Sequence, residues 1–89
     1  MVEIAFSSSF KKSFSKRIKG NKRIEEKFWD SIKLFMKEPF HEKLKTHKLS
    51  GKLQGLWSFS VEWDIRIIFY FADKNKVILI DIGKHEEVY

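Results

Sequence analysis

The stretch that decides the fold reads Trp57-Ser58-Phe59-Ser60-Val61-Glu62-Trp63-Asp64-Ile65-Arg66-Ile67-Ile68-Phe69-Tyr70-Phe71. Its bulky apolar residues take every second position, which is the period of a β-strand with one buried face. A turn near Trp63–Asp64 would divide the stretch into two strands. The alternation predicts a core face and an opposite face, which presents Ser58, Ser60, Glu62, Asp64 and Arg66.

A third strand is expected after this hairpin and two helices before it. Ala72–Asn75 has the composition of a turn, and Val77–Ile82 is a further β-run that ends before Gly83. Residues 39–55 look irregular. Upstream, apolar residues recur at helical spacing in two series, and the candidates are Phe10, Phe14 and Ile18, then Ile24, Phe28, Ile32 and Phe35.

The ends of these helices are also marked in the sequence. One of Ser7, Ser8 or Ser9 can cap the first helix, and Gly20-Asn21 ends it. The second helix begins at about Lys22 and stops at Glu38-Pro39, because the residue before proline avoids the helical region. Val2–Phe6 alternates weakly, as a short first strand would.

The resulting order is β–α–α–β–β–β. This order predicts an α+β fold, in which a mainly antiparallel, twisted sheet carries two N-terminal helices on one face. With 89 residues, we expect positions 1–89 to form a single domain. No cysteine is present, which excludes disulfides and a thiol nucleophile. Lysines interrupt the first twenty residues, and no stretch is apolar enough to span a bilayer, so we expect a cytoplasmic protein that makes no membrane contact.

Charge is distributed unevenly along the chain, which has a formal net charge of +6. Residues 9–37 hold ten Lys or Arg against three acidic residues, whereas residues 57–89 hold four basic and six acidic ones. A positive field over one half attracts polyanions, which include nucleic acids and acidic proteins. The charge alone leaves both kinds of partner open, and it is also compatible with two well-solvated helices.

Four segments give the chain a family resemblance: His47–Gly55, Trp57–Val61, Arg66–Tyr70 and the tail Ile82–Tyr89. Together they resemble the RelE/ParE toxin superfamily. The Gly-x-His of the tail and its terminal aromatic residue resemble, more narrowly, the YafQ-like branch of the RelE/StbE mRNA interferases. The resemblance is architectural over residues 1–38 and lies in the motifs over residues 39–89.

The resemblance implies the toxin of a type II toxin–antitoxin pair, an endoribonuclease that cleaves mRNA on the ribosome. Its partners would be an acidic antitoxin protein, mRNA in the ribosomal A site and rRNA. The family's reaction needs no metal or other cofactor: the ribose 2′-OH attacks the adjacent phosphate, which gives a 2′,3′-cyclic phosphate and a free 5′-OH. Such chemistry requires a base, an acid, positive charge and an aromatic surface for the nucleobase.

The resemblance assigns the proton-transfer residues. His85 matches the tail histidine and is the candidate proton donor to the leaving 5′-oxygen, and imidazole suits this role because both of its protonation states occur near neutrality. His47 matches the histidine at the head of the loop, as an acid or base. Asp64 matches an acidic position, as a base or as a group that orients a histidine. The alternatives are a surface histidine at position 85, a loop histidine on backbone at 47, and a plain hairpin aspartate at 64.

The remaining site candidates would bind the substrate. Arg66 would hold a phosphate, or otherwise pair with Glu62 or Asp81. Tyr89 would stack on a base or offer its hydroxyl, or otherwise fray as the last residue. The expected RNA contacts come from Lys45, Lys48, Lys52, Ser58 and Ser60. Some YafQ-like members carry an acid and a histidine in place of Ser58 and Ser60, so the identity of the general base stays open. His41 matches no family position.

Two rival functions share these observations. The first is a ParE-like inhibitor of DNA gyrase with the same fold and no nuclease chemistry. Against it stand His47, His85 and Tyr89, because a protein-binding inhibitor needs no such set. The second is a basic module that only binds nucleic acid, or an inactive toxin kept for regulation with its antitoxin.

Overall fold

The computed structural model describes all residues, 1–89. Its helices and strands follow the order β1 (Glu3–Phe6), α1 (Ser8–Arg17), α2 (Lys22–Lys37), β2 (His47–Lys48), β3 (Trp57–Glu62), β4 (Ile65–Asp73), β5 (Lys76–Lys84) and α3 (His85–Val88), with short 3₁₀ turns at Glu42–Leu44 and Gly51–Leu53. This is the predicted α+β arrangement, with β2 and α3 as additional elements.

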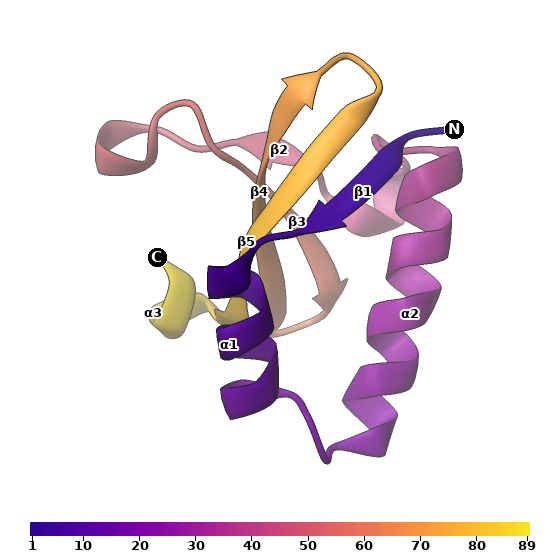
Figure 1. Cartoon of the computed structure of the whole chain (residues 1–89), viewed down its shortest axis with the longest axis vertical. Coiled ribbons are helices and arrows are strands. Elements are labelled where there is room, and N and C mark those ends of the chain that lie inside the picture. The colour runs from indigo at the N-terminus through magenta and orange to yellow at the C-terminus, as the bar shows by residue number, and fades with distance from the viewer.

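The sheet has five strands in the order β1-β5-β4-β3-β2. Strands β2 to β5 are antiparallel to their neighbours, whereas β1 runs parallel to β5. The sheet is therefore mixed, with the predicted antiparallel hairpins at its centre. Figure 1 shows β5 and β4 in the middle of the molecule, α2 along one side and the N-terminal strand beside β5.

Capping side chains define the starts of both N-terminal helices. The Ser7 hydroxyl accepts from the Phe10 N–H at 3.0 Å and begins α1, and the Asn21 side chain accepts from the Ile24 N–H at 3.2 Å and begins α2. Both helices contribute to one core cluster, whose members are Phe10, Ile18, Ile24, Phe28, Ile32, Phe35, Leu44, Phe59, Ile65, Ile67, Phe69, Val77, Leu79 and Ile82. All seven predicted helical apolar positions therefore face the sheet or the other helix, although Phe14 is only partly buried.

Helix α1 covers the part of β5 that β1 leaves unpaired. The register of β1 on β5 ends at Phe6 opposite Leu79, so the carbonyls further along β5 lack a strand partner. Ser9 donates to the Ile80 carbonyl at 2.8 Å, and Arg17 donates to the Ile82 carbonyl at 3.0 Å. These two side chains hydrogen-bond to carbonyls at an edge of β5 that would otherwise be open to pairing with another chain.

The prediction that Glu62 lies on the polar face of the hairpin is wrong, because β3 contains a β-bulge. The register of β3 on β4 shifts between Ser60 and Glu62, so Glu62 lies opposite the core-facing Ile65. The Glu62 carboxylate consequently reaches Arg23 of α2 at 2.6 Å and does not join the polar face. Trp63, which continued the apolar alternation in the sequence, lies in the turn with 85% of its surface exposed.

Three predicted boundaries differ from the structure. Helix α1 ends at Arg17, before Gly20. Ala72 and Asp73 belong to β4, so the turn to β5 is shorter than Ala72–Asn75. Strand β5 continues through Gly83 to Lys84 because antiparallel pairing with β4 persists to Ile65. No helix is both long enough and apolar enough to cross a membrane.

Candidate functional site

The C-terminal helix α3 folds back against the central strands. It contacts both β4 and β5, although it has only four residues. The Glu87 carboxylate accepts from the Lys84 N–H at 2.7 Å, which is one half of a capping box at its first turn. The Tyr89 N–H donates to the His85 carbonyl at 3.0 Å, so the last residue is part of the turn and does not fray.

His85 and Tyr89 form one cluster on the sheet face opposite the core. Their rings meet edge to face, with centroids 4.4 Å apart and planes at 83°. The Tyr89 hydroxyl donates to Ser58 Oγ at 2.5 Å. Ser58 alternates with the core-facing Trp57 and Phe59, so it lies on the opposite face, yet none of its surface is exposed. The tail thus closes over Ser58 and places an imidazole beside a phenol.

His47 lies next to this cluster on the neighbouring strand. It is the register partner of Ser58 in the β2–β3 pair, so both side chains point to the same face. His47 Nδ1 is 2.8 Å from the Lys45 carbonyl oxygen. Because a carbonyl only accepts, Nδ1 is the donor in this contact, which leaves Nε2 without a partner in the protein. The loop histidine therefore contacts backbone, as the alternative considered for it from the sequence had it.

Asp64 and Arg66 lie at the far end of the same hairpin. Asp64 precedes Ile65, whose partner is Lys84, and Lys84 precedes His85, so Asp64 and His85 share one end of the sheet. Arg66 forms neither of the ion pairs considered from the sequence. Its Nη1 donates to the Glu62 and Trp63 carbonyls at 3.2 and 2.8 Å, which leaves Nη2 and Nε without a partner in the protein.

The expected RNA-contact residues divide into two groups. Lys45, Lys48 and Lys52 are exposed along the loop that contains His47, and Lys48 Nζ lies 5.6 Å from the centre of the Trp57 ring. Ser58 is fully buried and hydrogen-bonded, so it supports Tyr89 and does not offer its hydroxyl to RNA. Ser60 is half-buried opposite Arg66.

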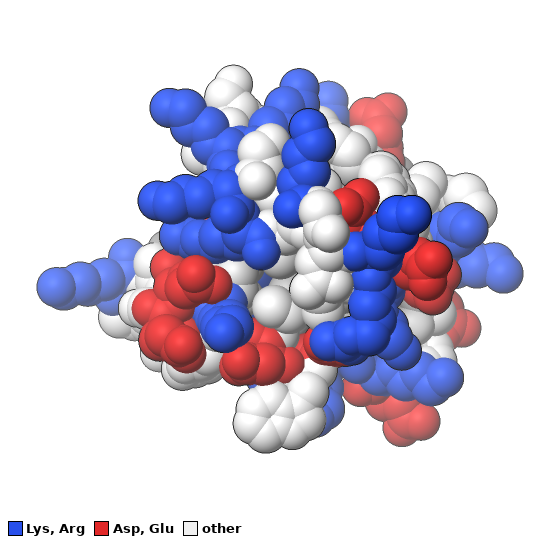
Figure 2. Space-filling view, turned by 90° about the horizontal axis from the view of Figure 1, so that it is seen from below, with Lys and Arg blue, Asp and Glu red and all other residues white.

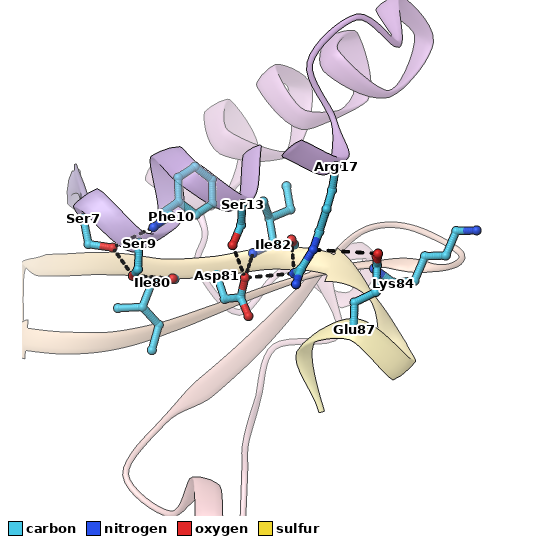
Figure 3. Close-up of polar contacts among 10 residues, drawn as sticks. All are labelled: Ser7, Ser9, Phe10, Ser13, Arg17, Ile80, Asp81, Ile82, Lys84 and Glu87. Carbon is cyan, nitrogen blue, oxygen red and sulfur yellow. Dashed lines mark hydrogen bonds and ion pairs between the residues drawn. The ribbon is translucent and has the colours of Figure 1, made fainter. Parts of the chain in front are cut away.

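The structure adds polar residues that sequence reasoning did not assign to the site. Arg17 of α1 contacts Asp81 of β5 and Glu87 of α3, as Figure 3 shows. The signal available was the spacing of Glu87 three residues after Lys84, which matches a capping box. The partner of Glu87, however, comes from the other end of the chain and has no local signal.

Ionic and metal-binding features outside this cluster are few. No group of three or more His, Cys, Asp or Glu side chains could hold a metal ion. The hydrogen bond and then the charge of Glu62 raise the pKa of Arg23 above its ordinary value, and this pair ties α2 to the hairpin. Figure 2 shows Lys and Arg spread over much of the lower end of the molecule, with Asp and Glu in smaller groups.

An apolar cleft lies between α1 and α2, away from the tail cluster. Its volume is about 350 Å³, and its lining comprises Phe6, Phe10, Lys11, Phe14, Ser15, Phe28 and Trp29. Trp29 remains 48% exposed at this cleft. A second, fully polar hollow adjoins it on α1, where its lining includes Lys11, Lys12 and Lys16.

Several solved structures share this fold. The metal-bound toxin from Helicobacter pylori superimposes over 100% of both chains with a TM-score of 0.78 and 22% identity. YafQ from Escherichia coli strain BL21(DE3) matches 100% of this chain and 99% of its own, with a TM-score of 0.77 and 19% identity. YoeB in the YoeB–YefM complex from Staphylococcus aureus matches with a TM-score of 0.73 and 20% identity, over 96% of this chain and 98% of its own.

The amino-acid sequence identifies the protein family, which the fold alone does not. Residues 2–89 match the family described as the bacterial toxin of the type II toxin–antitoxin system, YafQ. The chain belongs to this YafQ toxin family. Among curated protein sequences, none matches it.

Proposed function

We propose that this toxin is a ribosome-dependent endoribonuclease that cleaves mRNA without a metal or other cofactor and so stops translation. The observation that supports this most is the row His47, Ser58, Tyr89 and His85 across one sheet face. It combines two imidazoles, an aromatic surface and nearby cations, which is what transesterification at a phosphodiester needs.

In the proposed reaction, the 2′-oxygen attacks phosphorus and the bond from phosphorus to the 5′-oxygen breaks. His47 Nε2 accepts the proton from the 2′-OH, since the Lys45 carbonyl keeps the ring's other nitrogen protonated. His85, in its protonated form, donates to the leaving 5′-oxygen. The two products are a 2′,3′-cyclic phosphate and a 5′-OH, and the protons balance between the two histidines.

The neighbouring side chains then bind and stabilise the substrate. Tyr89 stacks on a nucleobase, and its hydroxyl bond to Ser58 sets the angle of the ring. The free Nη2 and Nε of Arg66 stabilise charge on the phosphate, while Nη1 stays bound to the turn. Lys45, Lys48 and Lys52 contact the RNA backbone. Asp64 lies at the end of the sheet shared with His85 but makes no hydrogen bond to it, so its proposed part, to orient that imidazole, begins only when RNA is bound.

The proposed partner in the absence of stress is an acidic antitoxin. The α1–α2 cleft suits such a protein because aromatic side chains line its floor and lysines line its rim. An amphipathic segment could insert an apolar side chain beside Trp29 and place carboxylates near Lys11. The YoeB–YefM complex shows that a toxin of this fold does assemble with an antitoxin.

Induced expression in bacteria tests this function. Wild type should arrest growth and leave translated mRNA cut, with 5′-OH ends. His85→Ala should do neither, whereas the matched control His41→Asn should behave as wild type, since the His41 ring contacts only the Lys43 N–H and the Glu38 carboxylate, both outside the tail cluster. Intact mRNA together with DNA breaks would instead indicate a gyrase inhibitor.

A further inference from the structure

One guanidinium connects three elements that are far apart in the sequence. Arg17, at the end of α1, donates from Nη1 to Asp81 Oδ1 at 3.1 Å and to the Ile82 carbonyl at 3.0 Å. Its Nε lies 3.7 Å from Glu87 Oε2 of α3. Figure 3 shows this side chain between the end of β5 and the first turn of α3. Arg17 thus ties α3 to α1 and β5.

The residues around Arg17 hold it at this angle. The Ser13 hydroxyl donates to the same Asp81 oxygen at 2.6 Å, and the Ile82 N–H donates to it at 2.9 Å. The contacts with Ser13 of α1 and with its own strand therefore orient the Asp81 carboxylate independently of Arg17. The Arg17 side chain is 23% exposed, so solvent screens its ion pairs only in part.

Gly83 provides the space that the contact needs. A Cβ at this position would lie 2.8 Å from Arg17 Nη1 and 2.9 Å from Glu87 Oε1. A side chain at position 83 would therefore require the ends of the Arg17 and Glu87 side chains to shift from their present contact. The backbone of Gly83 is extended within β5, so this position does not need glycine for a left-handed conformation. The close passage of the Arg17 side chain over the strand accounts for the glycine instead.

Helix α3 depends on such outside contacts. Four residues are far too few for a helix to persist on its own in water. Besides its internal cap, the polar contacts that dock it are the Arg17–Glu87 pair and, two residues further along the chain, the Tyr89–Ser58 bond. His85 precedes both attachments, and it has no hydrogen bond from its own ring to the rest of the protein.

We propose that Arg17 is a positioning residue. Its side chain passes over Gly83 and contacts Glu87, and this contact docks α3 against β5, which places His85 and Tyr89 for the reaction. Arg17 does not touch the reacting groups, and its effect is transmitted through α3. The consequence for catalysis rests on the proposed ribonuclease function. The docking itself does not, so the two can be tested separately.

The first experiment measures docking alone, by NMR on the free protein. Wild type should show contacts between the Tyr89 ring and Ser58 and a rigid backbone over residues 85–88. Arg17→Gln and Gly83→Ala should both lose these contacts while the core spectrum persists. Gly83→Ala removes no charge, and the matched control Lys76→Gln removes a positive charge and an ion pair at the opposite end of β5. Lys76→Gln should match wild type.

The second experiment measures cleavage of mRNA on programmed ribosomes. Because a small misplacement of an acid slows proton transfer, we expect kcat to fall by roughly tenfold to a hundredfold in Arg17→Gln and Gly83→Ala, with a smaller rise in KM because Tyr89 is displaced together with His85. The double variant should be no worse than the poorer single one, since both break the same contact. Glu87→Gln keeps the cap acceptor and should lose less.

The results separate the two proposals. The positioning role is refuted if Arg17→Gln and Gly83→Ala keep the Tyr89–Ser58 contacts. It is equally refuted if Arg17→Gln loses activity with α3 still docked, because Arg17 would then act on the substrate directly. If wild type cleaves no RNA but both variants release α3, the positioning role holds and the ribonuclease proposal fails.

Discussion

Removing the Tyr89 hydroxyl should cost more than a surface hydrogen bond usually does. In Tyr89→Phe, Ser58 Oγ loses its partner while its residue has no exposed surface. An unsatisfied buried hydroxyl costs about 1–3 kcal/mol. The cost has an upper limit, because α3 can detach and let water reach Ser58 once the penalty exceeds the free energy of docking.

The opposite substitution should be milder. In Ser58→Ala, the Tyr89 hydroxyl loses its acceptor, but Tyr89 is 42% exposed and its hydroxyl can turn to water. A net loss of about 0.5–1.5 kcal/mol is expected for an ordinary hydrogen bond. The double variant removes both polar atoms, so it should be more stable than Tyr89→Phe alone. The expected coupling between the two sites is about 1 kcal/mol.

Urea unfolding of the four proteins measures these differences. In a chain of this size, about 1 kcal/mol corresponds to a change in Tm of roughly 4–8 °C, so thermal unfolding provides a second reading. The reasoning is refuted if Tyr89→Phe is as stable as wild type, or if the two substitutions simply add. Either result would mean that Tyr89 does not close over Ser58. The contact that joins His47 and Ser58 to Tyr89 and His85 would then be absent.

Three further predictions concern the bases, the lysines and the cleft. His47→Gln should lower kcat by roughly a hundredfold or more, because it removes the proposed base, whereas Asp64→Asn should lower kcat less; the reverse order would make Asp64 the base. Lys48→Gln with Lys52→Gln should reduce the slope of log affinity for single-stranded RNA against log salt by about 1–2, and an unchanged slope would remove them from the RNA contact. Trp29→Ser should weaken binding of the proposed acidic antitoxin by about 2 kcal/mol or more and leave cleavage intact; equal affinity would place the antitoxin elsewhere.

The local pattern of this chain predicts most of its fold. Helical spacing and capping residues gave both N-terminal helices, and alternation gave β3, β4 and β5. The errors occur where tertiary contacts override the period. A bulge near Ser60 turned Glu62 toward Arg23, and pairing with Ile65 carried β5 past Gly83. A helix as short as α3 has no periodicity to detect.

The candidate site was less predictable than the fold. Resemblance proposed His47, His85 and Tyr89, but only the strand register reveals that Ser58 lies beside His47 and beneath Tyr89. A buried serine and an RNA-binding serine look the same in a sequence. The pairing of Arg17 with Glu87 joins the two ends of the chain, so no local pattern could indicate it.

The central claim is that His85 transfers a proton during RNA cleavage. The most direct measurement is a single-turnover reaction on ribosomes carrying a defined mRNA, with chemical analysis of the new ends. We expect a 2′,3′-cyclic phosphate and a 5′-OH with wild type, and a loss of rate of at least about a hundredfold with His85→Ala. Cleavage by His85→Ala at the wild-type rate, or a 5′-phosphate product, would contradict this claim.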